Sequence, residues 1–161
     1  MTPEQVDGLA WDKQGGLLPA IVQDAANGRI LMLGYMNREA LAATLESRRV
    51  TFYSRSKKRL WTKGESSGHV LELHSINLDC DGDTLLLLAR PHGPTCHQGT
   101  TTCFGDFPGP ALAFLGELGR LVEQRHRERP SGSYTTKLFD AGTRRIALAL
   151  PLPDEETLLT V

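Results

Sequence analysis

The chain has 161 residues, of which 40% are hydrophobic, enough for one domain with a buried core and a short appendage. Its formal net charge of −1 at pH 7 provides no global attraction to nucleic acid or to an anionic membrane surface. The longest apolar run, residues 85–89, is too short to span a bilayer, and the N-terminal residues have no export signal. We therefore expect a cytoplasmic protein that binds neither nucleic acid nor a membrane.

The predicted elements of the first ninety residues indicate an α+β domain. Strands are expected over 19–24 and 29–36, joined by a turn at 26–28, and a helix over 38–48 with Asn37 as its N-cap. Further strands are expected over 50–54 and 70–78, on either side of a polar, basic stretch at 55–68. The continuous apolar run 84–89 is typical of a buried central strand. These elements predict a small mixed sheet with one or two helices.

The pattern changes after the last predicted strand. Residues 91–105 have no periodicity and contain two cysteines, which is typical of a functional loop. After a break at 106–110, leucines at helical spacing predict a helix ending near Arg129, and residues 134–149 are predicted to be helical as well. We expect a first domain over 1–106 and a C-terminal helical hairpin in the tail, 107–161. The apolar face of the first tail helix is expected to dock on the first domain or on a second chain.

A dense acidic motif, DCDGD, occupies residues 79–83 between two predicted strands. The pair Asp81-Gly82 predicts a two-residue hairpin turn with positive φ at both residues. Three carboxylates so close together repel each other unless water or a cation neutralises them. A solvated acidic turn and a magnesium site both remain open, whereas a calcium EF-hand fits poorly because Thr84 and Arg90 stand where that loop needs glycine and glutamate.

The chain has three cysteines: Cys80, Cys96 and Cys103. An odd number cannot pair completely in disulfides, and a cytosolic protein keeps its thiols free or metal-bound. Three thiolates suit a zinc ion that keeps one coordination position for water, which is the arrangement of a catalytic site. The alternative of three unrelated thiols stays open on spacing alone.

The stretch 54–69 combines cationic side chains, hydroxyls and glycines. Such a stretch can hold a phosphate through charge and through backbone N–H groups. A solvated basic loop is the alternative interpretation. Trp61 within it can stack on a base, although a tryptophan is more often part of the core.

Several motifs in register resemble those of phosphoribosyl-AMP cyclohydrolase. They are SRS at 54–56, LW at 60–61, KGE at 63–65, SGH at 67–69, DCDGD at 79–83 and GPxCHxGxxxCF at 93–104. The resemblance covers roughly residues 8–105. Thr102 stands where serine is more usual in the family, and the change keeps a hydroxyl group.

The resemblance implies a cytoplasmic homodimer that uses zinc and magnesium. It implies hydrolytic opening of the adenine ring, at the C6–N1 bond, of the small-molecule nucleotide 1-(5-phosphoribosyl)-AMP in histidine biosynthesis. Adenine deaminases also add water at C6, but their His-x-Glu and Pro-Cys-x-x-Cys motifs are absent here. By motif position the metal ligands would be Cys80, Cys96 and Cys103 for zinc, shared between two chains, and Asp79, Asp81 and Asp83 for magnesium.

Further residues are expected to act on the substrate. His97 neighbours an expected zinc ligand, and imidazole transfers protons near neutral pH, so we expect His97 to be the general base, with His69 as the next candidate. The residues expected to contact the substrate are Arg55, Trp61, Lys63, Glu65 and Ser67.

The tail, from Leu115 to Ala147, resembles the opening of phosphoribosyl-ATP pyrophosphohydrolase, the domain that follows the cyclohydrolase in bifunctional enzymes. The family's lysine and acidic motif do not follow, so we expect no pyrophosphohydrolase activity. Two other interpretations of the whole chain remain: a non-catalytic zinc- or nucleotide-binding remnant, and a structural zinc domain whose fourth ligand is a histidine.

Overall fold

The computed structural model describes residues 3–105, 110 and 113–149. The chain divides into two compact units, Met1–Phe114 and Leu115–Val161. The expected domain boundary near residue 107 lies outside the described residues. In the described part of the chain, no helix is both long enough and apolar enough to cross a bilayer.

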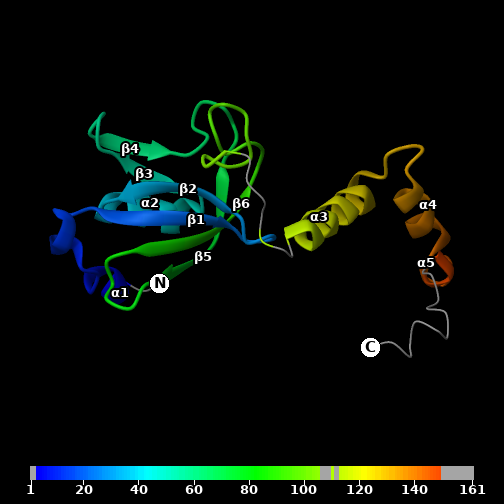
Figure 1. The fold of residues 1–161 in the computed structure, drawn as a ribbon, viewed down its shortest axis with the longest axis horizontal. Coiled ribbons are helices and arrows are strands. Elements are labelled where there is room, and N and C mark those ends of the chain that lie inside the picture. Colours follow the sequence, from blue (N-terminus) through cyan, green and yellow to red (C-terminus); the bar gives the residue numbers. More distant parts are fainter. Residues whose placement is uncertain (1–2, 106–109, 111–112, 150–161) are drawn as a thin grey trace. The chain divides into compact units, whose positions relative to one another are not determined.

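A four-stranded mixed sheet, in the order β2-β1-β6-β5, forms the centre of the first unit (Figure 1). Strand β1 pairs antiparallel with β2 and parallel with β6, and β5 and β6 form an antiparallel hairpin. The predicted α+β class and mixed sheet are therefore confirmed, and so is the interior place of the last strand. The strands are β1 Leu18–Asp24, β2 Ile30–Met36, β5 Leu71–Leu78 and β6 Leu85–Pro91.

Helix α2 (Arg38–Ser47) follows β2 and begins where the sequence predicted. The side chain of Asn37 accepts a hydrogen bond from the Ala40 N–H at 2.8 Å, which satisfies one of the free donors of the first turn. The buried face of the helix consists of Ala40, Leu41 and Thr44. Thr44 is fully buried, and its hydroxyl donates to Ala40 O and accepts from Thr51 N, so the helix is tied to the next strand.

A second, two-stranded sheet pairs β3 (Thr51–Ser54) with β4 (Arg59–Thr62). Strand β4 lies inside the basic stretch 55–68, where no strand was predicted. Its four residues are too few to give an alternating signal, and the pairing with β3 determines the conformation. The rings of Phe52 and Trp61 stack across this hairpin at 5.7 Å between centroids.

The N-terminal segment, which gave no clear signal, forms α1 (Pro3–Asp7) and the 3-10 helix η1 (Trp11–Gln14). Leu9 and Trp11 are buried, and the N–H of Ala10 donates to Gly82 O at 2.9 Å. The segment is therefore fixed against the turn between β5 and β6.

The tail contains α3 (Ala113–Glu128), α4 (Tyr134–Ala141) and α5 (Thr143–Ala149). The second expected helix is thus two, because Gly142, with φ +81°, interrupts it. The apolar face of α3 is exposed at Leu115, Leu118, Leu121 and Val122, and its expected docking stays a prediction.

Gly34 in β2 allows the β3–β4 hairpin to pack closely on the sheet. A Cβ atom at this position would lie 2.3 Å from Cδ1 of Phe52, whose side chain is fully enclosed. We expect Gly34→Ala to lower the free energy of unfolding by about 1–3 kcal/mol, because the buried ring has no space to shift. Denaturant unfolding measures the change.

The control is Gly119→Ala in α3, where an added Cβ would meet no atom within 4 Å. This variant should be neutral or slightly stabilising, since alanine favours a helix. Equal stability of Gly34→Ala and the wild type would contradict the proposed close packing.

Candidate functional site

A cavity of about 480 Å³ lies between the loop that follows β4 and the loop that follows β6. The sequence expectations converge on it, because eight of the expected site residues line it. They are Trp61, Lys63, Glu65, Ser67, His69, Cys96, His97 and Cys103. Residues from two segments more than twenty positions apart are thereby brought together around one space.

The Cys103 end of the second loop is anchored to strand β2. Leu31 has no partner on β1, because the register shifts between Val22 and Gln23 and leaves one extra residue on β2. The carbonyl oxygen of Leu31 accepts from the N–H of Cys103 at 2.8 Å and from the hydroxyl of Thr102 at 3.1 Å. The hydroxyl group of Thr102, which a serine at this position would also provide, therefore helps to fix the position of Cys103.

Cys96 lies in a tight turn that stabilises its thiolate. Its N–H donates to Thr100 O, and its carbonyl accepts from Gly99 N, both at 3.0 Å. The backbone N–H of Gln98 lowers the pKa of the Cys96 thiol below its usual value, and the hydroxyl of Thr100 adds to the effect. This electropositive turn favours the deprotonated form that binds a metal ion.

Cys103 is in a different electrostatic position. Loss of hydration raises the pKa of its thiol, and the neighbouring Cys96 thiol raises it further. The two thiols are close enough to interact directly, so both cannot carry a negative charge without compensation.

Both expected catalytic histidines lie at this cavity. His69 packs against Gly93, where an added Cβ would lie 2.6 Å from Cδ2 of its ring. Gly93 has φ +104°, a conformation that side-chain-bearing residues rarely adopt. The glycine therefore allows the turn to form and also leaves space for the His69 ring. Nδ1 of His97 lies 3.8 Å from Sγ of Cys96.

Lys63 follows β4 directly and is buried. Its N–H donates to Val50 O at 2.9 Å, and its ammonium donates to the carbonyl oxygen of His69 at 3.3 Å. Burial lowers the pKa of Lys63 below its usual value, whereas the thiols of Cys103 and Cys96 act in the opposite direction.

Two of the expected substrate contacts have partners within the protein. The Glu65 carboxylate is held by both terminal nitrogens of Arg59, at 2.5 and 3.2 Å, and this hydrogen-bonded pairing lowers the pKa of Glu65. The Arg55 guanidinium lies over the ring of Tyr35, 3.8 Å from its centroid, and Arg55 does not line the cavity. Trp61 and Ser67 line it, and their contact with the substrate stays a prediction.

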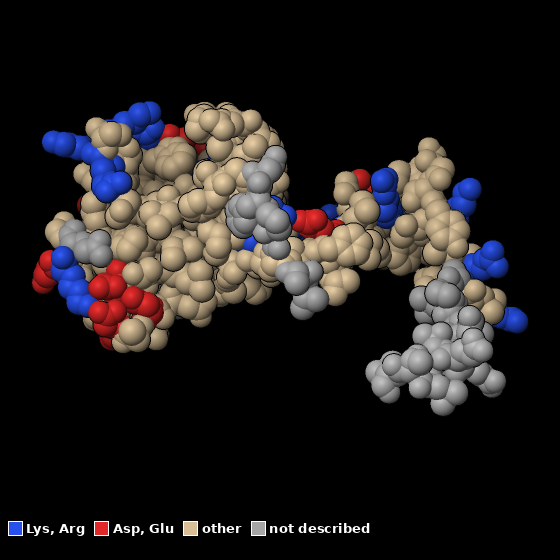
Figure 2. Space-filling view, viewed as in Figure 1, with Lys and Arg blue, Asp and Glu red and all other residues tan. Residues whose placement is uncertain are grey.

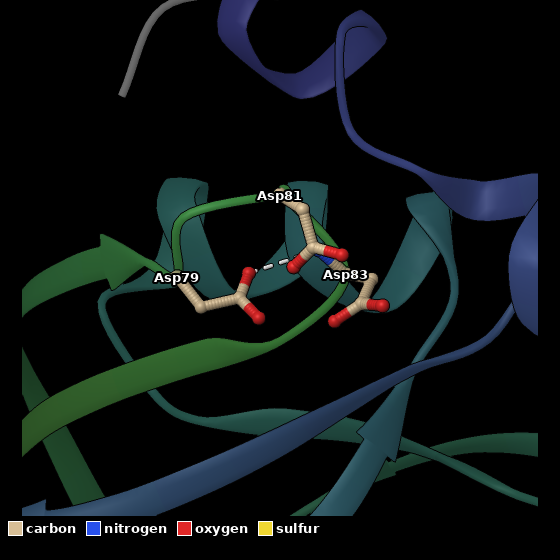
Figure 3. Close-up of side chains that lie close together, drawn as sticks. All are labelled: Asp79, Asp81 and Asp83. Atoms are coloured by element: carbon tan, nitrogen blue, oxygen red, sulfur yellow. Dashed lines mark hydrogen bonds between the residues drawn. The ribbon is translucent and has the colours of Figure 1, made fainter.

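The three aspartates at the β5–β6 turn form a second cluster, with one carboxylate oxygen of each within 4.8 Å of the others (Figure 3). Asp81 does not have the expected positive φ; among residues 79–83 only Gly82 does, at +70°. The turn is instead held by the Asp79 carboxylate, which accepts from the N–H groups of Asp83 at 2.9 Å and Thr84 at 3.1 Å.

A lysine from the N-terminal segment contacts this acidic turn. The ammonium of Lys13 donates to Asp81 and to Asp83, which raises the pKa of Lys13 and lowers that of Asp83. Figure 2 shows the acidic patch with basic side chains beside it, apart from a second basic group over β3 and β4. The negative charge at the turn is therefore partly balanced within the chain.

Cys80 is not brought to the cavity. It lies in the β5–β6 turn, whereas Cys96 and Cys103 lie in the loop at the other end of β6 (Figure 1). The seven residues of β6 span about 20 Å at the usual rise of a strand. Within the described residues, one chain therefore presents two of the three expected zinc thiols at the cavity and the third at the opposite end of the hairpin.

Comparison with known proteins matches residues 32–105 to the family described as phosphoribosyl-AMP cyclohydrolase. Relatives named histidine biosynthesis bifunctional protein HisIE match nearly the whole chain. The protein of Xanthomonas axonopodis pv. citri (strain 306) is 61% identical over 158 residues, 98% of this chain and 75% of the relative. The chain belongs to the phosphoribosyl-AMP cyclohydrolase family.

Two further HisIE proteins show similar coverage. That of Xylella fastidiosa (strain Temecula1 / ATCC 700964) is 62% identical over 151 residues, 94% of this chain and 72% of the relative. That of Escherichia coli (strain K12) is 54% identical over 159 residues, 99% of this chain and 78% of the relative. The expected hydrolase of histidine biosynthesis is confirmed, with the cyclohydrolase part in the first unit.

The cavity is also lined by residues that the sequence did not single out. Met32 lines it because the bulged strand β2 forms one wall. Thr95, next to Cys96, is 2% exposed, and its hydroxyl has no hydrogen-bond partner within the described residues. The sequence places Thr95 in the GPxCH motif, but it does not predict that the side chain is buried.

Proposed function

We propose that this cyclohydrolase opens the adenine ring of 1-(5-phosphoribosyl)-AMP at the C6–N1 bond, with zinc and magnesium as its cofactors. The observation that supports this most strongly is the convergence of two thiols, two imidazoles and a tryptophan on one cavity. Thiolates and imidazoles are the donors that zinc prefers, and an aromatic ring suits a purine.

The residues present are compatible with zinc. Cys96 and Cys103 interact directly, and the turn around Cys96 favours a thiolate. A bound zinc ion would lower the pKa of a coordinated water so that hydroxide is available near neutral pH. Around it, His97 would accept the proton of the attacking water, with His69 as the next candidate. Trp61 and Ser67 would hold the purine and a polar group of the substrate.

The third thiolate would come from a second copy of the chain. Because Cys80 lies at the far end of the β5–β6 hairpin, we propose a homodimer in which Cys80 of one protomer completes the site of the other. A two-fold dimer places the same patches in contact twice, so it would contain two such sites.

Complementation between variants tests the shared site. Cys80→Ser and Cys96→Ser should each lose zinc and activity, because serine lacks the soft, charged sulfur ligand. Mixed dimers contain one intact site, so the coexpressed pair should recover about a quarter of wild-type activity at random pairing. Zinc content and the ultraviolet change on ring opening are the measurements.

The matched control coexpresses Cys96→Ser with Cys103→Ser, which alter the same half of the site and should recover nothing. No recovery by the first pair in verified mixed dimers would contradict a shared site. Zinc bound at full occupancy without turnover in the wild type would favour the non-catalytic alternative.

His97→Ala is expected to lower kcat by about 100-fold, because a positioned general base contributes on that order. Zinc content should stay at the wild-type level, since the three proposed ligands are cysteines. Turnover kinetics and metal analysis are carried out on the same preparation. A near-normal kcat would transfer the proposed role to His69, and loss of zinc would instead make His97 a ligand.

The acidic turn is the proposed magnesium site, because hard cations bind carboxylate oxygens. A cation there has to displace the Lys13 ammonium from Asp81 and Asp83. We expect Lys13→Met to bind Mn²⁺, as a magnesium probe, several-fold more tightly, and Asp81→Asn to bind it more weakly. Calorimetric titration measures both changes. Identical affinities in all three proteins would contradict the assignment of this turn.

A further inference from the structure

Lys63 is a buried cation, 7% exposed. Among the described residues, its ammonium donates to one group, the main-chain oxygen of His69, and has no carboxylate partner. No salt bridge reaches Lys63 in the described part of the chain. Glu65 is the only carboxylate among the described residues that line the same cavity, and it is bound by Arg59. A cation removed from water is destabilising unless an anion compensates its charge.

The groups placed to provide that compensation are thiols. Lys63, Cys96 and Cys103 line the same cavity. Consistent with this, the two thiols act to raise the pKa of Lys63, and Lys63 acts to lower the pKa of the Cys103 thiol. Its position is set by the hairpin rather than by a free loop, because it follows β4 and its N–H is bound by Val50. The carbonyl of His69 further restricts the ammonium.

We propose that Lys63 is a positioning residue whose ammonium balances the negative charge of the Cys96 and Cys103 thiolates at the metal centre. The inference rests on the proposed zinc function and deepens it. Three thiolates around one divalent ion leave a net negative charge, which one buried ammonium neutralises. From the sequence, Lys63 was instead expected to contact the substrate, and the two roles predict different measurements.

The test measures zinc affinity of the full chain by competition with a chromophoric chelator. Lys63→Met keeps the length and removes the charge, and we expect it to weaken zinc binding by about 10–100-fold, the usual effect of removing a partner of the ligands. Lys63→Arg keeps the charge and should retain most of the affinity. Lys137→Met, at an exposed position of α4, is the matched control and should bind like the wild type.

Circular dichroism of the metal-free proteins verifies that each variant folds. Wild-type zinc affinity in Lys63→Met would overturn the inference, and a raised KM in that protein would assign Lys63 to the substrate. Equal losses in Lys63→Met and Lys63→Arg would overturn it as well, because packing rather than charge would then be responsible. Absence of zinc binding in the wild type would overturn the proposed zinc centre itself, a result distinct from the other two.

Discussion

The extra residue at Leu31 in β2 is the constraint on which the candidate site depends. In a regular antiparallel pair, alternate residues of an edge strand such as β2 bond the partner strand, and the backbone groups of the residues between them face outward. The bulge leaves the Leu31 carbonyl to accept from both Cys103 and Thr102. Two hydrogen bonds to one strand residue therefore fix the Cys103 end of an otherwise irregular loop against the sheet. The other end is held by β6, from which the loop emerges.

Charge is the second constraint on the cavity. Two neighbouring thiols, one lysine and two imidazoles share a space in which Lys63 has little access to water. The turn at Cys96 favours a thiolate through backbone N–H groups, whereas the site of Cys103 opposes one. The pKa values of the two thiols are therefore shifted in opposite directions, although both cysteines belong to one motif. A divalent cation, as in the proposed zinc site, would stabilise both thiolates at once.

The sequence predicted the strands of the main sheet, helix α2 and its cap, because apolar periodicity and Asn37 are local signals. It missed β4, whose conformation comes from pairing with β3 and not from its own four residues. It was wrong about the conformation of Asp81, because the Asp79 carboxylate supplies hydrogen bonds that a two-residue turn does not need.

The sequence predicted which residues line the cavity better than it predicted the interactions of their side chains. Spacing and motif resemblance identified the residues that converge, but they carry no information on which side chains are already engaged. Only the structure places Arg59 on Glu65 and Tyr35 under Arg55. A motif shows that a charged residue is needed at a position. It does not show whether that charge binds a ligand or another side chain of the protein.

The β5–β6 hairpin keeps the three cysteines of one chain apart. Its strands carry Cys80 to one end and the Cys96–Cys103 loop to the other, and a paired strand cannot fold back on itself to join them. A centre with all three thiols therefore has to form between chains or not at all. The acidic turn lies at the same end as Cys80, so a dimer that completes the zinc site would also bring Asp79, Asp81 and Asp83 toward the partner's cavity. In the proposed dimer, a phosphorylated substrate would meet a thiolate-rich cavity from one protomer and a cation-binding turn from the other, and assembly would then be a condition of catalysis.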